Sequence, residues 1–192
     1  MNLPSFFIDN SDSMKYEETI DFYMSWTIRC ADIKHQQANK KVNDSARRIL
    51  AKLLQFEHAD GLLFSNIQVW KQHKNIDIWV ELMVNNQQYA LIIENKMYSE
   101  IHSNQLNRYQ KIAEKYYKDQ PTRIVEYVLL RPDYELDQQD KDLNIVSDFH
   151  YMNLEQLADT NENGKTDNHL FDEFWFNWTE DAEKFRNQKL NI

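Results

Sequence analysis

The sequence predicts a single α/β domain over residues 1–192, and three observations carry this prediction. The chain has 192 residues and a mass of 23.3 kDa, a size that fits one domain. Hydrophobic residues make up 42% and aromatic residues 13%, which supports a packed core despite 28% charged residues. Helix-like and strand-like segments follow one another in an order that suits a sheet covered by helices.

Two helices are expected first, at residues 17–34 and 43–57. In the second, apolar side chains recur at spacings of three and four residues, which is the period of a helix with one buried face. Asn, Asp and Ser cap helix starts because their side-chain oxygens accept hydrogen bonds from free backbone N–H groups. The candidate caps of this helix are Asn43, Asp44 and Ser45.

Three strands are expected next, at residues 65–71, 76–84 and 87–95. The last two show the alternation of strand side chains, and only Asn85 and Asn86 separate them. Asn tolerates the positive φ that a two-residue turn requires. The sequence therefore predicts an antiparallel hairpin.

The remaining segments continue with further helices and strands. They are a helix at 102–118, a strand at 125–130, a polar surface loop at 133–148, a strand at 150–153, a short helix at 154–160 and a final aromatic-rich helix. One stripe of the final helix consists of Phe171, Phe174, Trp175, Trp178, Ala182 and Phe185. Core packing is the first interpretation of this stripe, and a homodimer interface is the alternative.

The composition excludes several classes of enzyme and site. Gly61 and Gly164 are the only glycines, so no Gly-rich phosphate loop, dinucleotide fingerprint or nucleophile elbow is present. Cys30 is the only cysteine, which excludes an internal disulfide and any multi-cysteine metal site. The N-terminus lacks the pattern of a signal peptide, and no apolar run is long enough to span a membrane. We therefore expect a cytoplasmic protein without a membrane partner.

The charge is unevenly distributed along the chain. The net charge is −9 and the isoelectric point is near 5.1, which at first argues against a nucleic-acid partner. However, residues 133–183 carry 15 acidic residues against two lysines, and stretches 34–52 and 96–118 are basic. The cations of these stretches either contact phosphate groups or form solvated helix faces, and the pattern leaves both open. The candidate phosphate contacts are Lys40, Lys41, Arg47, Arg48, Arg108, Lys111 and Lys115.

Two carboxylates are expected to face each other across the predicted hairpin. If the two asparagines form the turn, counting back along both strands pairs Asp77 with Glu94, and Lys96 lies on the same face. Two carboxylates whose Cβ atoms lie roughly 5 Å apart repel each other unless a cation lies between them. Oxygen ligands without cysteine or histidine suit Mg²⁺ or Mn²⁺, and a nearby lysine stabilises charge on a phosphate. The pattern indicates phosphodiester hydrolysis, while purely structural roles at the strand ends stay open.

The same residues resemble a known family. Asp77, followed by Glu94-Asn95-Lys96 at the end of a hairpin strand and by Gln105 and Tyr109 on the next helix, resembles the PD-(D/E)XK nuclease superfamily. The resemblance is strongest to bacterial members with an IENK strand and a QLxRY helix, here residues 93–96 and 105–109. It covers about residues 65–130, and Ile76 stands where the family often has proline. It implies a restriction-endonuclease-like αβββαβ core with a mixed central sheet flanked by helices, plus a C-terminal helix.

The resemblance also implies roles for individual residues. Asp77 and Glu94 would bind the metal together with the main-chain carbonyl of Asn95, and Lys96 would be the catalytic lysine. Gln105 would face the site from the helix, with Tyr109 as a supporting contact. A glutamate of the first helix would complete the metal site, for which we favour Glu18 over Glu17.

Two functional hypotheses follow. The first is a Mg²⁺- or Mn²⁺-dependent nuclease that acts on nucleic acid, in our expectation DNA, in defence or DNA processing. The second is a catalytically inactive protein of the same fold, which binds a basic partner or mimics nucleic acid through the acidic surface of residues 133–183. Because Asp77, Glu94 and Lys96 are all present, the enzyme is favoured.

Overall fold

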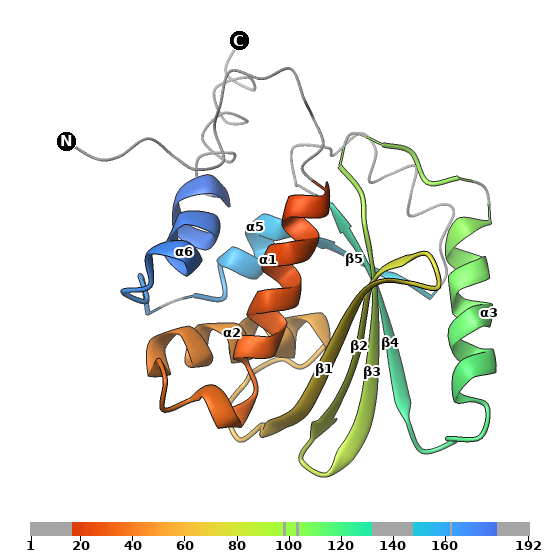
Figure 1. Ribbon diagram of the computed structural model, residues 1–192, viewed down its shortest axis with the longest axis horizontal. Coiled ribbons are helices and arrows are strands. Elements are labelled where there is room, and N and C mark those ends of the chain that lie inside the picture. Colours follow the sequence, from red (N-terminus) through yellow and green to blue (C-terminus); the bar gives the residue numbers. More distant parts are fainter. Residues whose placement is uncertain (1–16, 98, 103, 132–147, 162, 180–192) are drawn as a thin grey trace.

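A computed structural model describes residues 17–97, 99–102, 104–131, 148–161 and 163–179 (Figure 1). Its centre is a mixed five-stranded sheet with the order β1-β2-β3-β4-β5. The first two strand pairs are antiparallel and the last two are parallel. The strands are β1 (Phe64–His73), β2 (Ile76–Val84), β3 (Gln87–Asn95), β4 (Ile124–Arg131) and β5 (His150–Asn153). This confirms the expected α/β fold with a mixed central sheet.

Helices cover both faces of the sheet and enclose a separate apolar core on each side (Figure 1). Of the helices in the described part of the chain, α3 (Gln105–Tyr117) is the one that covers one face. The other face is covered by α1 (Glu17–Cys30), α2 (Lys40–Leu53), α5 (Leu154–Ala158), α6 (His169–Asp172) and the π-helical η3 (Glu173–Trp178), and a short 3-10 helix, η1 (Ile33–His35), follows α1. No helix among the described residues is both long enough and apolar enough to cross a membrane.

The β2–β3 hairpin has the predicted register. Asn85 and Asn86 have φ values of 47° and 71°, and Ile78 pairs with Ile93. Since side chains alternate along a strand, this register decides which residues share a face. Trp79 and Ile92 pack in the core beneath α3, so Asp77 and Glu94, two residues along each strand, are directed to the α3 side.

The second helix begins earlier than expected. It starts at Lys40 because the side chain of Asn39 accepts a hydrogen bond from the Val42 N–H at 3.0 Å. The predicted caps were therefore wrong. Asn43 instead lies buried inside the helix, where its amide donates to the Cys30 carbonyl oxygen at 2.7 Å and ties α2 to α1.

The aromatic stripe at the C-terminus packs into the core of this chain. Phe171, Phe174 and Trp175 are each at most 1% exposed, which confirms core packing for these three. The segment is an α-helical turn followed by a π-helix rather than one α-helix. The side chain of Trp178, residues Ala182 and Phe185, and nearly all of the expected loop at 133–148 lie outside the described part.

Replacing Trp175 tests how firmly this segment is anchored. Its indole N–H donates to the Thr27 hydroxyl of α1 at 3.0 Å, and its ring packs against Phe174. We expect Trp175→Ala to lower the free energy of unfolding by ~3–5 kcal/mol in urea titrations, because a large buried ring is lost. Leu170→Ala, at an exposed neighbouring position, should change it by less than ~0.5 kcal/mol. Equal effects of the two substitutions would show that the segment does not pack as described.

Candidate active site

The candidate site lies where the first residues of β2, the last residues of β3 and the start of α3 meet, beside the N-terminal end of α1. It contains Asp77 from β2, Glu94 and Asn95 from β3, Lys96 directly after β3, and Gln105 from α3. The structure thus brings together five of the residues singled out from the sequence. We refer to these five residues as the candidate site.

Glu94 is at the centre of the site and is only 1% exposed. Its Oε1 accepts hydrogen bonds from the Lys96 ammonium at 2.7 Å and from the Gln105 amide at 2.6 Å. The same Gln105 amide nitrogen donates to the Tyr109 hydroxyl at 2.9 Å, which places Tyr109 behind it in a supporting position. The second carboxylate oxygen, Oε2, is buried without a hydrogen-bond partner. A buried oxygen without a partner is costly unless another ligand satisfies it.

Asp77 lies next to Glu94, and its negative charge acts on the Glu94 carboxyl group. Its Oδ2 accepts a hydrogen bond from the Asn95 N–H at 2.9 Å, and its Oδ1 accepts one from the Gln72 amide at 2.9 Å. Two carboxylate anions side by side repel each other unless a proton or a cation neutralises one of them. The pair therefore has to bind either a proton or a cation.

The electrostatics favour retention of this proton in the absence of metal. Burial, together with the charge of Asp77, raises the pKa of Glu94 to about 8, although Lys96 acts in the opposite direction. Burial alone would lower the pKa of Lys96, but the carboxylates of Glu94, Asp77 and Glu17 together outweigh burial, so the pKa of Lys96 is raised. Lys96, which is 13% exposed, is therefore a cation held against the carboxylate pair.

Two acidic residues of α1 complete the surroundings of the site. Asp21 accepts a hydrogen bond from the Asn95 side-chain amide at 3.1 Å, and burial together with the charge of Asp77 raises the pKa of Asp21 to about 7. Glu17 accepts hydrogen bonds from the Met97 N–H at 2.8 Å and the Ser99 hydroxyl at 2.7 Å. Glu17 thereby holds the segment that follows Lys96.

The structure does not bring Glu18 to the site. Glu18 is exposed, and its charge acts on Lys71. Asp21, which sequence reasoning missed, occupies the buried side of α1 together with Ile20 and Met24. The sequence did contain a signal for Asp21, because an acidic residue stands there at a position where helical periodicity predicts an apolar one.

The basic residues of α2 lie far from the site. Arg47 donates to the Leu62 carbonyl oxygen at 2.8 Å, and the next residue, Leu63, donates its N–H to Asn85. Asn85 belongs to the turn at the other end of the hairpin, roughly 25 Å from Asp77 along an extended strand. The structure therefore does not bring the α2 cations to the site. In α2, Lys40 pairs with Asp44, Lys41 pairs with Asp167, and Arg48 has a buried Nη1 without a hydrogen-bond partner.

The basic residues of α3 lie nearer to the site. Arg108 is one turn beyond Gln105, is exposed, and lies 5.4 Å from the ring centre of Tyr109. Lys111 and Lys115 continue along the exposed side of the same helix. Of the seven predicted phosphate contacts, these three belong to an element that contributes to the site.

The donor set fits a hard divalent cation. Among the described residues, no group of three or more Asp, Glu, His or Cys side chains is arranged to hold a metal. A cation at the Asp77–Glu94 pair would therefore take its other oxygens from main-chain carbonyl groups, water and substrate. Mg²⁺ is commonly bound in this way, through one or two carboxylates. The partnerless Oε2 of Glu94 is a ligand atom available for this purpose.

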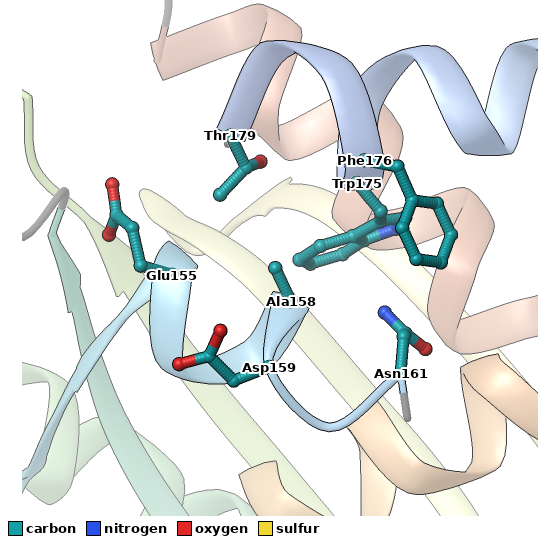
Figure 2. Close-up of a pocket in the computed structure, with 7 residues that line it drawn as sticks. All are labelled: Glu155, Ala158, Asp159, Asn161, Trp175, Phe176 and Thr179. Atoms are coloured by element: carbon teal, nitrogen blue, oxygen red, sulfur yellow. The ribbon is translucent and has the colours of Figure 1, made fainter. Parts of the chain in front are cut away.

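A pocket of about 270 Å³ lies elsewhere, between α5 and the C-terminal π-helix (Figure 2). Glu155, Asp159, Asn161 and Trp175 are among its lining residues. The two carboxyl groups give this pocket an acidic lining, which opposes binding of a phosphate. None of the residues that line this pocket belongs to the candidate site.

Comparison with known families agrees with the fold. The family model of the PD-(D/E)XK nuclease superfamily matches residues 14–175, and the chain belongs to this superfamily. The mixed sheet flanked by helices is consistent with its restriction-endonuclease-like fold. In parallel searches, neither a curated protein nor a solved structure matches the chain.

The shifted pKa of Glu94 predicts how the stability of the metal-free protein depends on pH. The ordinary value is 4.5 and the folded value is about 8, so between these values the folded state retains a proton that the unfolded state releases. Stability is therefore highest below the unfolded pKa and falls as pH rises, by at most ~1.4 kcal/mol per pH unit for one group. In EDTA, Glu94→Gln should show a shallower fall between pH 5 and pH 8 than the wild type.

Urea titrations across this pH range measure the effect, and the difference between the two proteins cancels contributions of other groups such as Asp21. Parallel curves for the wild type and Glu94→Gln would contradict the assignment of a raised pKa to Glu94.

Proposed function

We propose that this protein is a Mg²⁺- or Mn²⁺-dependent nuclease that hydrolyses phosphodiester bonds of DNA in the cytoplasm. The observation that carries the proposal is the placement of Asp77 beside the buried Glu94, with the Lys96 ammonium 2.7 Å from Glu94. Two adjacent carboxyl groups suit a divalent cation, and a positively charged lysine beside them suits the charge that develops on a phosphate. Membership of the PD-(D/E)XK nuclease superfamily supports a nucleic-acid substrate.

The residues that would hold the metal are Asp77, Glu94 and the main-chain carbonyl of Asn95. When bound, a divalent cation supplies positive charge that polarises the scissile phosphate and favours deprotonation of water. Metal binding requires both carboxyl groups to be ionised. It therefore competes with the proton that Glu94 retains because its pKa is raised.

The other residues of the site position the reacting groups. Lys96 is held by Glu94 and can donate hydrogen bonds from its ammonium to the attacking water and to a phosphate oxygen. Gln105 fixes the orientation of Glu94 from α3, and Tyr109 supports Gln105 through its hydroxyl. These contacts hold the site before substrate arrives, which reduces the reorganisation needed during the reaction.

The exposed cations of α3 are the phosphate contacts that we propose for the substrate. Arg108, Lys111 and Lys115 lie on the helix whose first residue, Gln105, contacts Glu94. Contacts of this kind give affinity that depends on salt concentration, and they position the backbone without reading the base sequence.

Two substitutions at the site should impair cleavage in different ways. Lys96→Ala should reduce metal-dependent cleavage by about 100-fold or more, since one preorganised electrostatic group is lost, while DNA binding is retained. Glu94→Ala should weaken metal binding itself, so that excess Mn²⁺ partly restores cleavage. Excess metal should not restore Lys96→Ala.

The measurement is cleavage of linear DNA, circular DNA and RNA across a titration of Mg²⁺ and Mn²⁺. Lys52→Ala serves as the matched control, because Lys52 is an exposed lysine of α2 outside the site. Thermal unfolding of each variant excludes misfolding. If the wild type cuts none of these substrates, or if Lys96→Ala cuts as well as Lys52→Ala, the proposal is wrong and the fold serves binding alone.

A further inference from the structure

Three aromatic side chains form a partly exposed row beside the candidate site. Trp70 and His73 of β1 have ring centres 6.2 Å apart, and His73 lies 6.3 Å from Tyr116 of α3. Trp70 is 39% exposed and Tyr116 is 47% exposed, while His73 is half-buried. We call Trp70, His73 and Tyr116 the aromatic platform. Large aromatic side chains left accessible to solvent in this way often mark a binding surface.

A rigid layer of buried side chains supports the platform from below. The Trp79 ring is 5.2 Å from His73 and 5.1 Å from Tyr116. The Trp79 indole N–H donates to the Tyr117 hydroxyl at 2.7 Å, and this hydroxyl donates to Glu81 at 2.8 Å. Because the layer below is buried and hydrogen-bonded, the exposed rings are held in place without a ligand. Such preorganisation reduces the entropic cost of binding.

Cations border the platform on two elements. Lys74, in the turn between β1 and β2, lies 5.4 Å from the ring centre of Tyr116. Lys115 directly precedes Tyr116, and Arg108 lies two turns earlier on the same helix. All three are exposed. Aromatic rings for bases, with cations for phosphates, are the combination that binds single-stranded nucleic acid.

The platform is continuous with the candidate site through the end of β1. His73 pairs with Ile76, the residue before Asp77. Gln72, the neighbour of His73, has a φ of 53° in the left-handed region, which is uncommon for a residue other than glycine. Its side-chain amide donates to Asp77 at 2.9 Å. The same short segment therefore contributes one ring of the platform and one contact to the site.

We propose that the aromatic platform stacks the unpaired bases of single-stranded DNA whose backbone reaches the Asp77–Glu94 pair. The inference rests on the proposed function and names its substrate class as DNA with a single-stranded segment. Stacking is indifferent to base identity, since every base has a π face. Duplex DNA keeps its bases stacked on one another and offers the platform only its ends. A protein partner is the competing occupant, because exposed Trp and Tyr also anchor protein interfaces.

Binding measured in EDTA tests the platform without cleavage. The full-length chain would be titrated into a fluorescently labelled oligothymidylate and into a duplex of the same length, and anisotropy would be recorded. We expect the wild type to prefer the single strand. Trp70→Ala and Tyr116→Ala should each weaken single-strand binding by about fivefold or more, the loss that corresponds to one stacked base. Their effect on duplex binding should be smaller.

Conservative variants separate stacking from structure. Tyr116→Phe and Trp70→Phe keep a ring and should retain most of the affinity, whereas the alanine variants should not. Quenching of tryptophan fluorescence by the oligothymidylate should diminish in Trp70→Phe. Lys74→Ala should reduce the dependence of binding on salt by about one phosphate contact. Leu170→Ala, an exposed apolar position on α6, is the control that should bind like the wild type.

The outcomes separate this inference from the proposed function. If the alanine variants bind the single strand as tightly as the wild type, or lose single-strand and duplex binding equally, the platform does not stack bases. If sedimentation shows that they instead change self-association, the surface is an interface between copies of the chain and the inference is overturned. Loss of single-strand binding in a protein that cuts no substrate would support the platform and refute the nuclease. If the wild type cleaves DNA and the alanine variants cleave it equally well, the nuclease is supported and the platform is refuted.

Discussion

The structure around the candidate site depends on one constraint, the placement of two carboxyl groups side by side on the same face of a hairpin. The register of β2 and β3, which pairs Ile78 with Ile93, places Asp77 next to Glu94, and a slip of one residue would turn one of them to the other face. A fold that keeps two acids in contact must neutralise them. In the metal-free protein, a proton and the ammonium of Lys96 do so. The raised pKa of Glu94 reflects how unfavourable a second negative charge is beside Asp77 in a buried position. Gln105 and Asn95 are placed around this pair.

The surrounding contacts keep Lys96 where the pair needs it. Lys96 follows the last residue of β3, and its N–H donates to the Leu130 carbonyl oxygen at 2.9 Å, which continues the pairing with β4. Beyond it, the segment is fixed from two sides, by the Glu17 carboxylate and by the buried Arg131, whose guanidinium donates to the Ser99 carbonyl oxygen at 2.8 Å. Because a long flexible lysine loses less entropy when its backbone is already fixed, this arrangement favours a defined ammonium position.

Local chemistry made the hairpin and its carboxylate pair predictable, whereas long-range packing decided the features that were missed. Two asparagines that tolerate positive φ specify the turn, and alternation then specifies the faces. Helical periodicity marks Asp21 as an acid on the buried side of α1, but its proximity to the site depends on how α1 packs across the sheet, which the sequence does not give. The same holds for the basic residues of α2, whose charge pattern suggested a phosphate contact although the helix lies at the opposite end of the hairpin.

The most direct test of the central claim is anomalous diffraction from a crystal of the wild-type protein soaked with Mn²⁺. The account predicts an anomalous peak between the carboxyl groups of Asp77 and Glu94, within a coordination distance of about 2.0 to 2.3 Å from an oxygen of each. A fully soaked crystal with no anomalous peak beside these two carboxyl groups would contradict the account.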